Sequence, residues 1–325
     1  MSRSARSITD PAQPGPMDGK SRAGPDDPRP WHARWYVGRR SEPGVKSASR
    51  LLGEVVARGS RSVVHAYGHG AVIKVPKPAT PAGWILAEAR HVEAVRAVGA
   101  PAPALLGIED VFGRPATVWE RVDGPSLWEC VVEHPERSGE LGRALAEVQL
   151  ALFELVPPVT LPDQRDRLTS KIRWSAANVD ASLGGALELL TERSSTARLC
   201  HGDLHPSNII VSGGGLVLVD WFDASRGDRV ADVARSCLTM LADGAKMPSH
   251  LPGSDPGTLT VLTRAYLTRL RESLDIPAAL LARWQAIGAV ARVAEGMPRE
   301  PLLEVWRRFA WSEGVAADGQ AAAAG

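Results

Sequence analysis

The chain has 325 residues, of which 44% are apolar, so it is long enough to form two parts that each bury a core. Its formal net charge of +1 favours neither nucleic acid nor an anionic membrane as a partner. The three cysteines form no closely spaced even set, no apolar run approaches the ~20 residues that cross a bilayer, and no signal-peptide core stands at the N-terminus, so a cytoplasmic protein is predicted.

The N-terminal segment, residues 1–48, is rich in Pro, Gly, Ser, Arg and Asp and poor in aliphatic side chains. Such a composition cannot bury enough apolar surface to offset chain entropy, so the segment is predicted to be disordered. Trp31, Trp35 and Tyr36 interrupt it with a basic, aromatic patch, which could pack loosely on the folded part or dock on a partner. The Ala- and Gly-rich tail at 317–325 is also predicted to be disordered.

Three short apolar runs follow, at residues 51–57, 63–68 and 71–75, and they predict three strands. A turn that contains Gly59 and Ser60 joins the first two runs. Small residues at a turn let backbone N–H groups approach phosphates closely, so Gly59 and Ser60 are candidate nucleotide-binding residues. The same turn would also suit an ordinary hairpin, because a full Gly-x-Gly-x-x-Gly pattern is absent.

Lys74 stands in the middle of the third apolar run, where a cation is costly to bury without a partner. Helical periodicity over residues 84–98 places an acid, Glu88, on the apolar face. That face consists of Ile85, Glu88, Val92 and Val95. We therefore expect a buried ion pair between Lys74 and Glu88. The alternatives are that Glu88 is solvated, or that it pairs with Arg90 or Arg96.

Two further strands are predicted at residues 105–108 and 116–119, and a linker between two lobes at 120–125. Periodicity and breakers then predict helices in the remaining chain. These helices lie at 139–155, 168–178, 183–193, 230–241, 259–273, 278–294 and 301–312.

The most informative stretch is 200–224, which reads CHGDLHPSNIIVSGGGLVLVDWFDA. Two apolar runs, 209–211 and 216–219, flank a Gly-rich turn and predict a β-hairpin. If the last residue of the first run opposes the first residue of the second, Asn208 and Asp220 both lie at the open end of the hairpin. A side-chain amide and a carboxylate then face the same space.

Carboxylate and amide oxygens at this end suit Mg²⁺, which normally keeps waters and completes its shell with substrate phosphates. Asn208 and Asp220 are therefore candidate metal ligands, and Asp203, on the preceding loop, is a candidate base. A zinc site at His201 and His205 is an alternative. It would need both rings on one helix face, and the proline after His205 argues against a helix there.

The pattern His-Gly-Asp-x-x-x-x-Asn at 201–208, followed by a hydrophobic hairpin and Asp220, resembles the catalytic and metal loops of the aminoglycoside phosphotransferase and choline kinase family. The resemblance implies that Asp203 is the catalytic base and that Asn208 and Asp220 hold Mg²⁺. It also implies that His205 contacts the γ-phosphate or shapes the loop.

The same resemblance implies an α+β, bilobal protein-kinase-like fold. A small β-rich N-lobe is expected at 49–122, and a larger, mainly helical C-lobe at 123–316. Mg-ATP, or Mg-GTP, would bind between the lobes, with Lys74 positioning the α- and β-phosphates and Glu88 holding Lys74. The family also implies that Asp232 anchors the catalytic loop.

About eight residues separate Asp220 from the next predicted helix, too few for the long segment on which a protein kinase docks a peptide. A small-molecule hydroxyl acceptor is therefore favoured, and Asp223 is a candidate for supporting the metal ligands. The acids near the expected acceptor cleft are interspersed with arginines and predict solvated helix faces rather than an acidic pocket for a polycationic drug. They are Glu272, Asp275, Glu295, Glu300, Glu304 and Glu313.

The prediction is thus an ATP-dependent phosphotransferase that acts on a hydroxyl of an aminoglycoside-like antibiotic or another hydroxylated metabolite. Two other classes remain open: a non-catalytic nucleotide-binding module of kinase ancestry, and a protein kinase. No nucleic-acid or membrane partner is expected, and the sequence predicts neither the acceptor nor the oligomeric state.

Overall fold

The computed structural model describes residues 52–190, 196–243, 256–297 and 299–312. The segments predicted to be disordered, 1–48 and 317–325, lie outside these residues, as does most of the loop at 242–257 that precedes the last predicted helices. Within the described ranges, no helix has both the length and the apolar character needed to cross a membrane.

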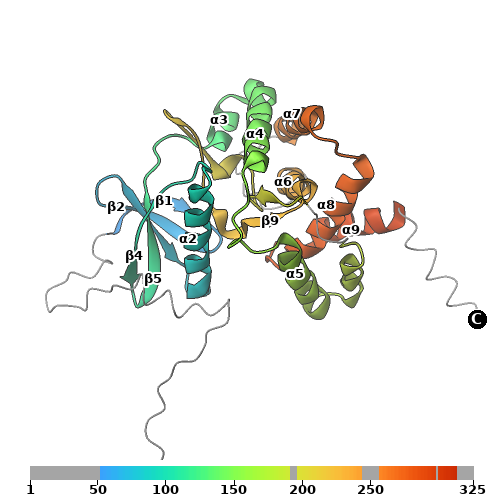
Figure 1. Ribbon diagram of the computed structural model, residues 1–325, viewed down its shortest axis with the longest axis horizontal. Helices are drawn as coiled ribbons and strands as arrows, with labels where there is room; N and C mark the ends of the chain where they lie inside the picture. The colour runs from blue at the N-terminus through green and yellow to red at the C-terminus, as the bar shows by residue number, and fades with distance from the viewer. Residues whose placement is uncertain (1–51, 191–195, 244–255, 298, 313–325) are drawn as a thin grey trace, which may run out of the picture. The chain divides into compact units, whose positions relative to one another are not determined.

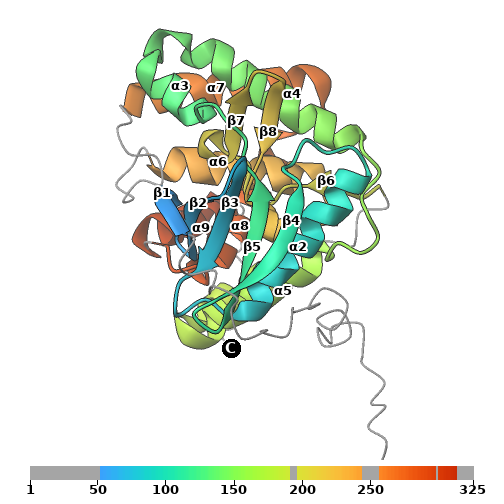
Figure 2. The same ribbon diagram turned by 90° about the vertical axis from the view of Figure 1, so that its left-hand side faces the viewer.

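A five-stranded antiparallel sheet opens the described chain (Figure 1), and its strands lie in the order β1-β2-β3-β5-β4 (Figure 2). All five predicted strands are present, and the last two are longer than predicted because they continue to a tight turn at Phe112–Gly113. The strands are β1 (Leu52–Arg58), β2 (Ser62–Tyr67), β3 (Ala71–Pro76), β4 (Leu105–Val111) and β5 (Arg114–Glu120).

Helix α2 (Ala82–Ala97) packs against β4 and β5 (Figure 2). Its buried face contains all four residues that the periodicity placed there, and these include Glu88, whose side chain is only 5% exposed. Gly99, with φ of 92°, follows the helix and lets the chain turn away. The face that carries Glu88 is thereby fixed toward the strand that carries Lys74.

The second part of the described chain is mainly helical. Helix α4 packs on α7, and α8 packs on α5, α6 and α9, around a core that contains Leu145, Leu152 and Tyr266. The helices are α3 (Leu127–Glu133), α4 (Ser138–Glu154), α5 (Gln164–Asn178), α6 (Arg229–Asp243), α7 (Pro256–Ser273), α8 (Ala278–Val293) and α9 (Arg299–Ser312).

The structure contains one helix that was not predicted, and one predicted helix needs correction. Helix α3 was not predicted, although it begins with a capping box in which Ser126 and Glu129 bond each other's backbone N–H groups. The helix predicted at 183–193 is instead a 3-10 helix at Ala181–Leu187, and the end of the predicted range lies outside the described residues. Two glycines in that 3-10 helix lower the stability of a regular α-helix there.

The predicted hairpin is present as β7 (Ile209–Ser212) and β8 (Gly215–Leu218), and Val211 opposes Leu216 as expected. Strands β6 (Arg198–Cys200) and β9 (Ser225–Gly227) pair with each other at the two ends of the segment 201–224, which contains the hairpin. Because Cys200 opposes Ser225, the loop with the candidate site residues starts and ends at a fixed base. The site is therefore carried on an anchored segment rather than a free loop.

Candidate active site

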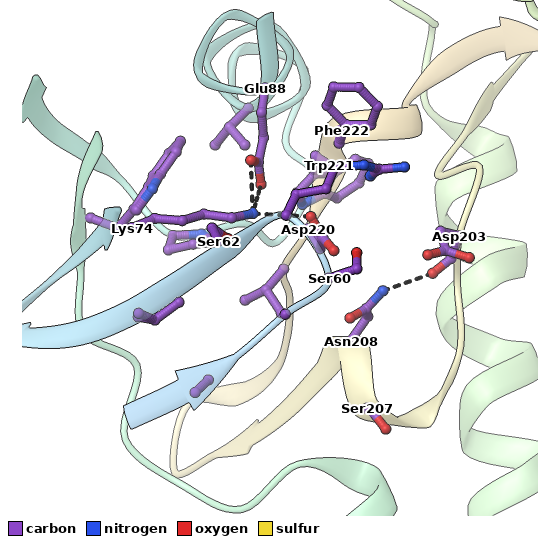
Figure 3. A pocket seen from close by; sticks show the side chains of 18 of the residues that line it. Ser60, Ser62, Lys74, Glu88, Asp203, Ser207, Asn208, Asp220, Trp221 and Phe222 are labelled. Carbon is purple, nitrogen blue, oxygen red and sulfur yellow. Dashed lines mark hydrogen bonds and ion pairs between the residues drawn. The ribbon is translucent and has the colours of Figure 1, made fainter. Parts of the chain in front are cut away.

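A pocket of about 760 Å³ lies between the sheet and the helical part of the described chain (Figure 3). Its wall includes residues 119–124, which cover most of the predicted linker. Every residue predicted from the sequence as a catalytic residue, a nucleotide-binding residue or a metal ligand lines it. These residues are Gly59, Ser60, Lys74, Glu88, Asp203, His205, Asn208 and Asp220.

Lys74 on β3 reaches across the pocket to two acids. Its Nζ atom lies 2.6 and 2.7 Å from the two carboxylate oxygens of Glu88, and 3.0 Å from Oδ1 of Asp220. The predicted ion pair is therefore present. Burial alone would lower the pKa of Lys74, but the charges of Asp220 and Glu88 outweigh it and hold the pKa above its ordinary value. Lys74 is thus a fully charged cation in the pocket.

Asp220 and Asn208 are held close together by the hairpin. The N–H of Val219 donates to the carbonyl of Asn208 at 3.0 Å, which extends the β7–β8 pairing to the open end. Asp220 adopts a left-handed conformation with φ of 64°, which turns its carboxylate out of the strand direction into the pocket, where the side chain is 42% exposed. Nδ2 of Asn208 donates to the carbonyl of Asp203 at 2.9 Å.

The donor set fits Mg²⁺ better than zinc. Asn208 and Asp220 supply hard oxygen donors, and Lys74 lowers the pKa of Asp220, so the carboxylate is ionised. In the described part of the chain no three His, Cys, Asp or Glu residues are grouped to hold a metal ion. The ring of His201 is buried and packs at an angle of 43° against the ring of Trp221, and its Nε2 atom lies 3.2 Å from the carbonyl oxygen of Val219. Neither His201 nor His205 lies in a helix, so the shared helix face that the zinc alternative requires is not formed by these residues.

Asp203, the candidate base, contacts an arginine that the sequence did not predict. Nη2 and Nε of Arg235, on α6, lie 3.1 and 3.3 Å from Oδ1 of Asp203, while Nε2 of His205 lies 3.9 Å from Oδ2. Burial disfavours the ionised carboxylate, but the charge of Arg235, supported by His205 and Arg292, outweighs burial and keeps the pKa of Asp203 below its usual range. Asp203 is therefore anionic.

A chain of buried ion pairs continues from Arg235. Its Nη1 atom lies 2.9 Å from Glu295, and Lys171 bridges Glu295 at 2.7 Å and Asp223 at 2.9 Å. Asp223 also accepts from Arg167 at 2.7 Å. Two expectations are corrected here. Glu295 is buried in the site rather than on a solvated face, and Asp223 pairs with Lys171 and Arg167 rather than supporting the metal ligands.

The loop that carries Asp203 is anchored by Asp232, as the resemblance implied. Its two carboxylate oxygens accept the backbone N–H groups of Gly202 at 2.8 Å and His201 at 3.2 Å. Gln149, on α4, donates to the same carboxylate at 2.9 Å and accepts a bond from the Tyr266 hydroxyl. No role for Gln149 follows from the sequence, but in the structure its side chain satisfies the buried carboxylate of Asp232.

Gly202 makes a testable contribution to the position of Asp203. It has φ of 79°, and a Cβ atom there would lie 2.2 Å from the carbonyl oxygen of Asp223. We expect Gly202→Ala to lower the free energy of unfolding by about 3 kcal/mol or more, because backbone strain adds to a clash with another backbone segment. Gly113→Ala is the matched control, since Gly113 has φ of 76° but open space around it.

Urea unfolding measures both Gly→Ala variants. Gly113→Ala is expected to cost only about 1 kcal/mol, the cost of the left-handed conformation alone. Equal losses in the two variants would contradict the importance of the close approach at Gly202.

Comparison with known proteins gives a family match and a fold match. The sequence model of a family described as "Phosphotransferase enzyme family" matches residues 54–249, which include all the candidate site residues. A search of the curated proteins found no match to this chain.

Among solved structures, the chain is similar to aminoglycoside-3'-phosphotransferase of type VIII, with 20% identity, a TM-score of 0.52, and coverage of 73% of this chain and 91% of that chain. It is similar to APH(3'')-Id from Streptomyces rimosus, with 18% identity, a TM-score of 0.53, and coverage of 73% and 92%. A thermostable APH(4)-Ia mutant, solved with ADP and hygromycin B, has 18% identity, a TM-score of 0.53, and coverage of 84% and 94%. At these identities the similarity shows a shared fold.

Proposed function

The chain belongs to the phosphotransferase enzyme family, and from this premise we propose that it transfers the terminal phosphate of ATP, or of GTP, to a hydroxyl group of a small molecule. The observation that carries the proposal is the convergence of Lys74, Asp203, Asn208 and Asp220 on one pocket. In this proposal the N-lobe spans residues 49–122 and the C-lobe begins at 123. The nucleotide binds where the two meet.

Nucleotide binding is assigned to the sheet side of the pocket. Lys74 positions the α- and β-phosphates, and Glu88 keeps Lys74 directed into the pocket. The turn at Gly59 and Ser60 offers backbone N–H groups to the phosphates. His205, beside Asp203, contacts the terminal phosphate or shapes the loop.

Metal binding is assigned to Asn208 and Asp220. A bound Mg²⁺ would supply neutralisation of the charge that develops on the phosphates during transfer. The protein provides two of the oxygen ligands, which suits Mg²⁺ because this ion usually shares its coordination shell among protein, phosphate and water. Lys74 adds a fixed positive charge 3.0 Å from Asp220.

Asp203 is assigned to the acceptor. Its carboxylate accepts a hydrogen bond from the acceptor hydroxyl and aligns that oxygen with the terminal phosphate. It takes the proton as the new P–O bond forms, while the bond from the terminal phosphorus to the bridging oxygen breaks and the nucleoside diphosphate leaves. Because Arg235 lowers its pKa, Asp203 is a weak base, and most of the rate enhancement comes from positioning and charge neutralisation.

The acceptor end of the pocket does not favour a polycation. Its two acids in the described chain, Asp203 and Glu295, are both ion-paired with Arg235, and Arg292 also lines the wall. The short distance from Asp220 to α6 leaves little chain for docking a peptide, which supports a small acceptor. We therefore propose a hydroxylated compound that is neutral or only weakly basic, rather than an aminoglycoside.

The proposed function is tested by ADP release with MgATP and a panel of hydroxylated antibiotics, amino alcohols, nucleosides and sugars. Turnover with one class of acceptor would support it. Nucleotide binding without turnover on any acceptor would favour the non-catalytic alternative, and phosphorylation of generic peptides would favour a protein kinase.

Metal dependence is a further prediction. We expect chelation by EDTA to abolish turnover and added Mg²⁺ to restore it. Asp220→Asn, which removes one ligand charge, is expected to raise the Mg²⁺ concentration for half-maximal turnover by on the order of tenfold. The control is Asp123→Asn, because Asp123 lines the same pocket but its side chain is 81% exposed and pairs with Arg121. Full activity of Asp220→Asn at unchanged Mg²⁺ would contradict the ligand assignment.

A further inference from the structure

The turn between β1 and β2 carries a cation, Arg61, that has no part in the function proposed above. The turn at 59–61 contains a single glycine, so fewer backbone N–H groups can approach a phosphate than in a glycine-rich loop. An arginine in the same turn can supply the missing donors, because its guanidinium presents several N–H groups in a planar fork.

The backbone at Arg61 is held firmly. Its carbonyl accepts the N–H of Lys77 at 2.8 Å and the hydroxyl of Thr80 at 2.6 Å, which ties the turn to the chain between β3 and α2. The side chain of Arg61 lines the pocket. The turn therefore presents its cation to the same space that Lys74 and Asp220 enter.

Two aromatic rings hold the guanidinium in place. Its Cζ atom lies 4.3 Å from the centre of the Phe222 ring and 5.7 Å from that of the half-exposed Trp84, and the two ring centres are 5.5 Å apart. Such cation–π contacts stabilise a guanidinium without using its N–H donors. The donors of Arg61 thus stay available to an anion.

The position of Phe222 brings Arg61 close to the candidate metal ligand. Phe222 follows Asp220 by two residues, and both residues line the pocket (Figure 3). Lys74 is the main cause of the lowered pKa of Asp220, and the charge of Arg61 lowers it further. Phosphates that share a metal ion with Asp220 would lie within reach of the Arg61 side chain.

We propose that Arg61 binds the terminal phosphate of the nucleotide, as a side-chain substitute for the glycine-rich phosphate loop that this chain lacks. The assignment rests on the proposed function, because it assumes a nucleoside triphosphate in this pocket. An arginine can make two parallel charge-assisted hydrogen bonds to phosphate oxygens. Trp84 and Phe222 hold its guanidinium over the cleft before the nucleotide arrives, which lowers the entropy lost on binding.

The test compares binding of ADP and of the non-hydrolysable triphosphate AMP-PNP by calorimetry with Mg²⁺ present. In Arg61→Ala the dissociation constant for AMP-PNP is expected to rise by about tenfold or more, while that for ADP changes less than about threefold. Arg61→Lys keeps the charge but loses the planar fork of the guanidinium. Its dissociation constant for AMP-PNP is expected to lie between that of the wild type and that of Arg61→Ala. Arg58→Ala is the matched control, since it removes the same charge from the end of β1 on the same pocket wall.

Phe222→Leu separates phosphate binding from a purely structural contact between the turn and the helical part. This variant keeps Arg61 but removes the nearer of the two rings that hold its guanidinium, so it is expected to lose part of the preference for AMP-PNP, and less than Arg61→Ala loses. An equal loss for ADP and AMP-PNP in Arg61→Ala, or the same loss in Phe222→Leu as in Arg61→Ala, would overturn the assignment. If the wild-type protein bound neither nucleotide, the proposed function would fail and the assignment with it.

Discussion

Replacing Asp203 with alanine is expected to lower kcat by about 10³-fold or more while ADP still binds with an affinity within about threefold of the wild type. General-base catalysis alone contributes 10²- to 10⁴-fold, and the alignment of the acceptor hydroxyl is lost at the same time. Arg235 keeps Glu295 as a partner in this variant, so its charge is not left uncompensated. The measurements are steady-state ADP release with an active acceptor and calorimetry with ADP.

Asp203→Asn divides the two tasks of the carboxylate. The amide can still accept a hydrogen bond from the acceptor hydroxyl, but it cannot take its proton. If proton transfer matters, Asp203→Asn is as inactive as Asp203→Ala, and if orientation alone matters, it retains much of the activity. Asp123→Asn, at the exposed edge of the same pocket, is the control. Substantial residual kcat in Asp203→Ala would refute the assignment of Asp203 as the base.

The parts of the site that the sequence predicted are those with a local signal. The hairpin register follows from two apolar runs around a Gly-rich turn, so the sequence alone places Asn208 and Asp220 at one end of the hairpin. Lys74 and Glu88 each break an apolar pattern of known period, and a charge at a buried position needs a partner. The break in each apolar pattern and the free-energy cost of burying an unpaired charge together predict the ion pair between Lys74 and Glu88.

The parts that were missed have no local signal. Arg235 and Glu295 are 32 and 92 residues from Asp203 along the chain, and Glu295 belongs to a set of acids that are interspersed with arginines in the sequence. Only the packing of α6 against α8 brings them together under the pocket. The charge pattern therefore predicted a solvated face, whereas the structure contains a buried network. Helix α3 is different, because its capping box at Ser126 and Glu129 could have been recognised.

Replacing Lys74 with methionine is expected to abolish turnover and also to lower the free energy of unfolding by roughly 3–5 kcal/mol. The side chain of Glu88 is 5% exposed, so the substitution would leave a buried carboxylate without its cation. Lys77→Met, at the residue that directly follows β3, is the control, since no ion pair of Lys77 is present among the described residues. Urea unfolding and ADP release are measured on the same samples.

The double variant Lys74→Met/Glu88→Leu separates the stability of the pair from its role in catalysis. Removing both charges leaves no unpaired group, so most of the lost stability is expected to return, while turnover stays absent because nothing positions the α- and β-phosphates. Recovery of turnover in the double variant would contradict the role assigned to Lys74. If stability is not recovered, the destabilisation in Lys74→Met comes mainly from the unpaired carboxylate of Asp220 rather than from that of Glu88.

The pH dependence of Lys74→Met gives an independent check, with a sign that follows from burial. In the wild type, burial raises the pKa of Glu88 and Lys74 opposes that increase, so removing Lys74 raises the pKa further. A group whose pKa is higher in the folded than in the unfolded state stabilises the fold below its unfolded pKa, and that stability is lost as the pH rises through the folded pKa. The stability deficit of Lys74→Met relative to wild type should therefore shrink as the pH falls from 7 toward about 5. The double variant Lys74→Met/Glu88→Leu has no carboxyl at position 88, so its free energy of unfolding relative to wild type should not increase as the pH falls over this range. An increase in the double variant as well would show that another acid causes the pH dependence.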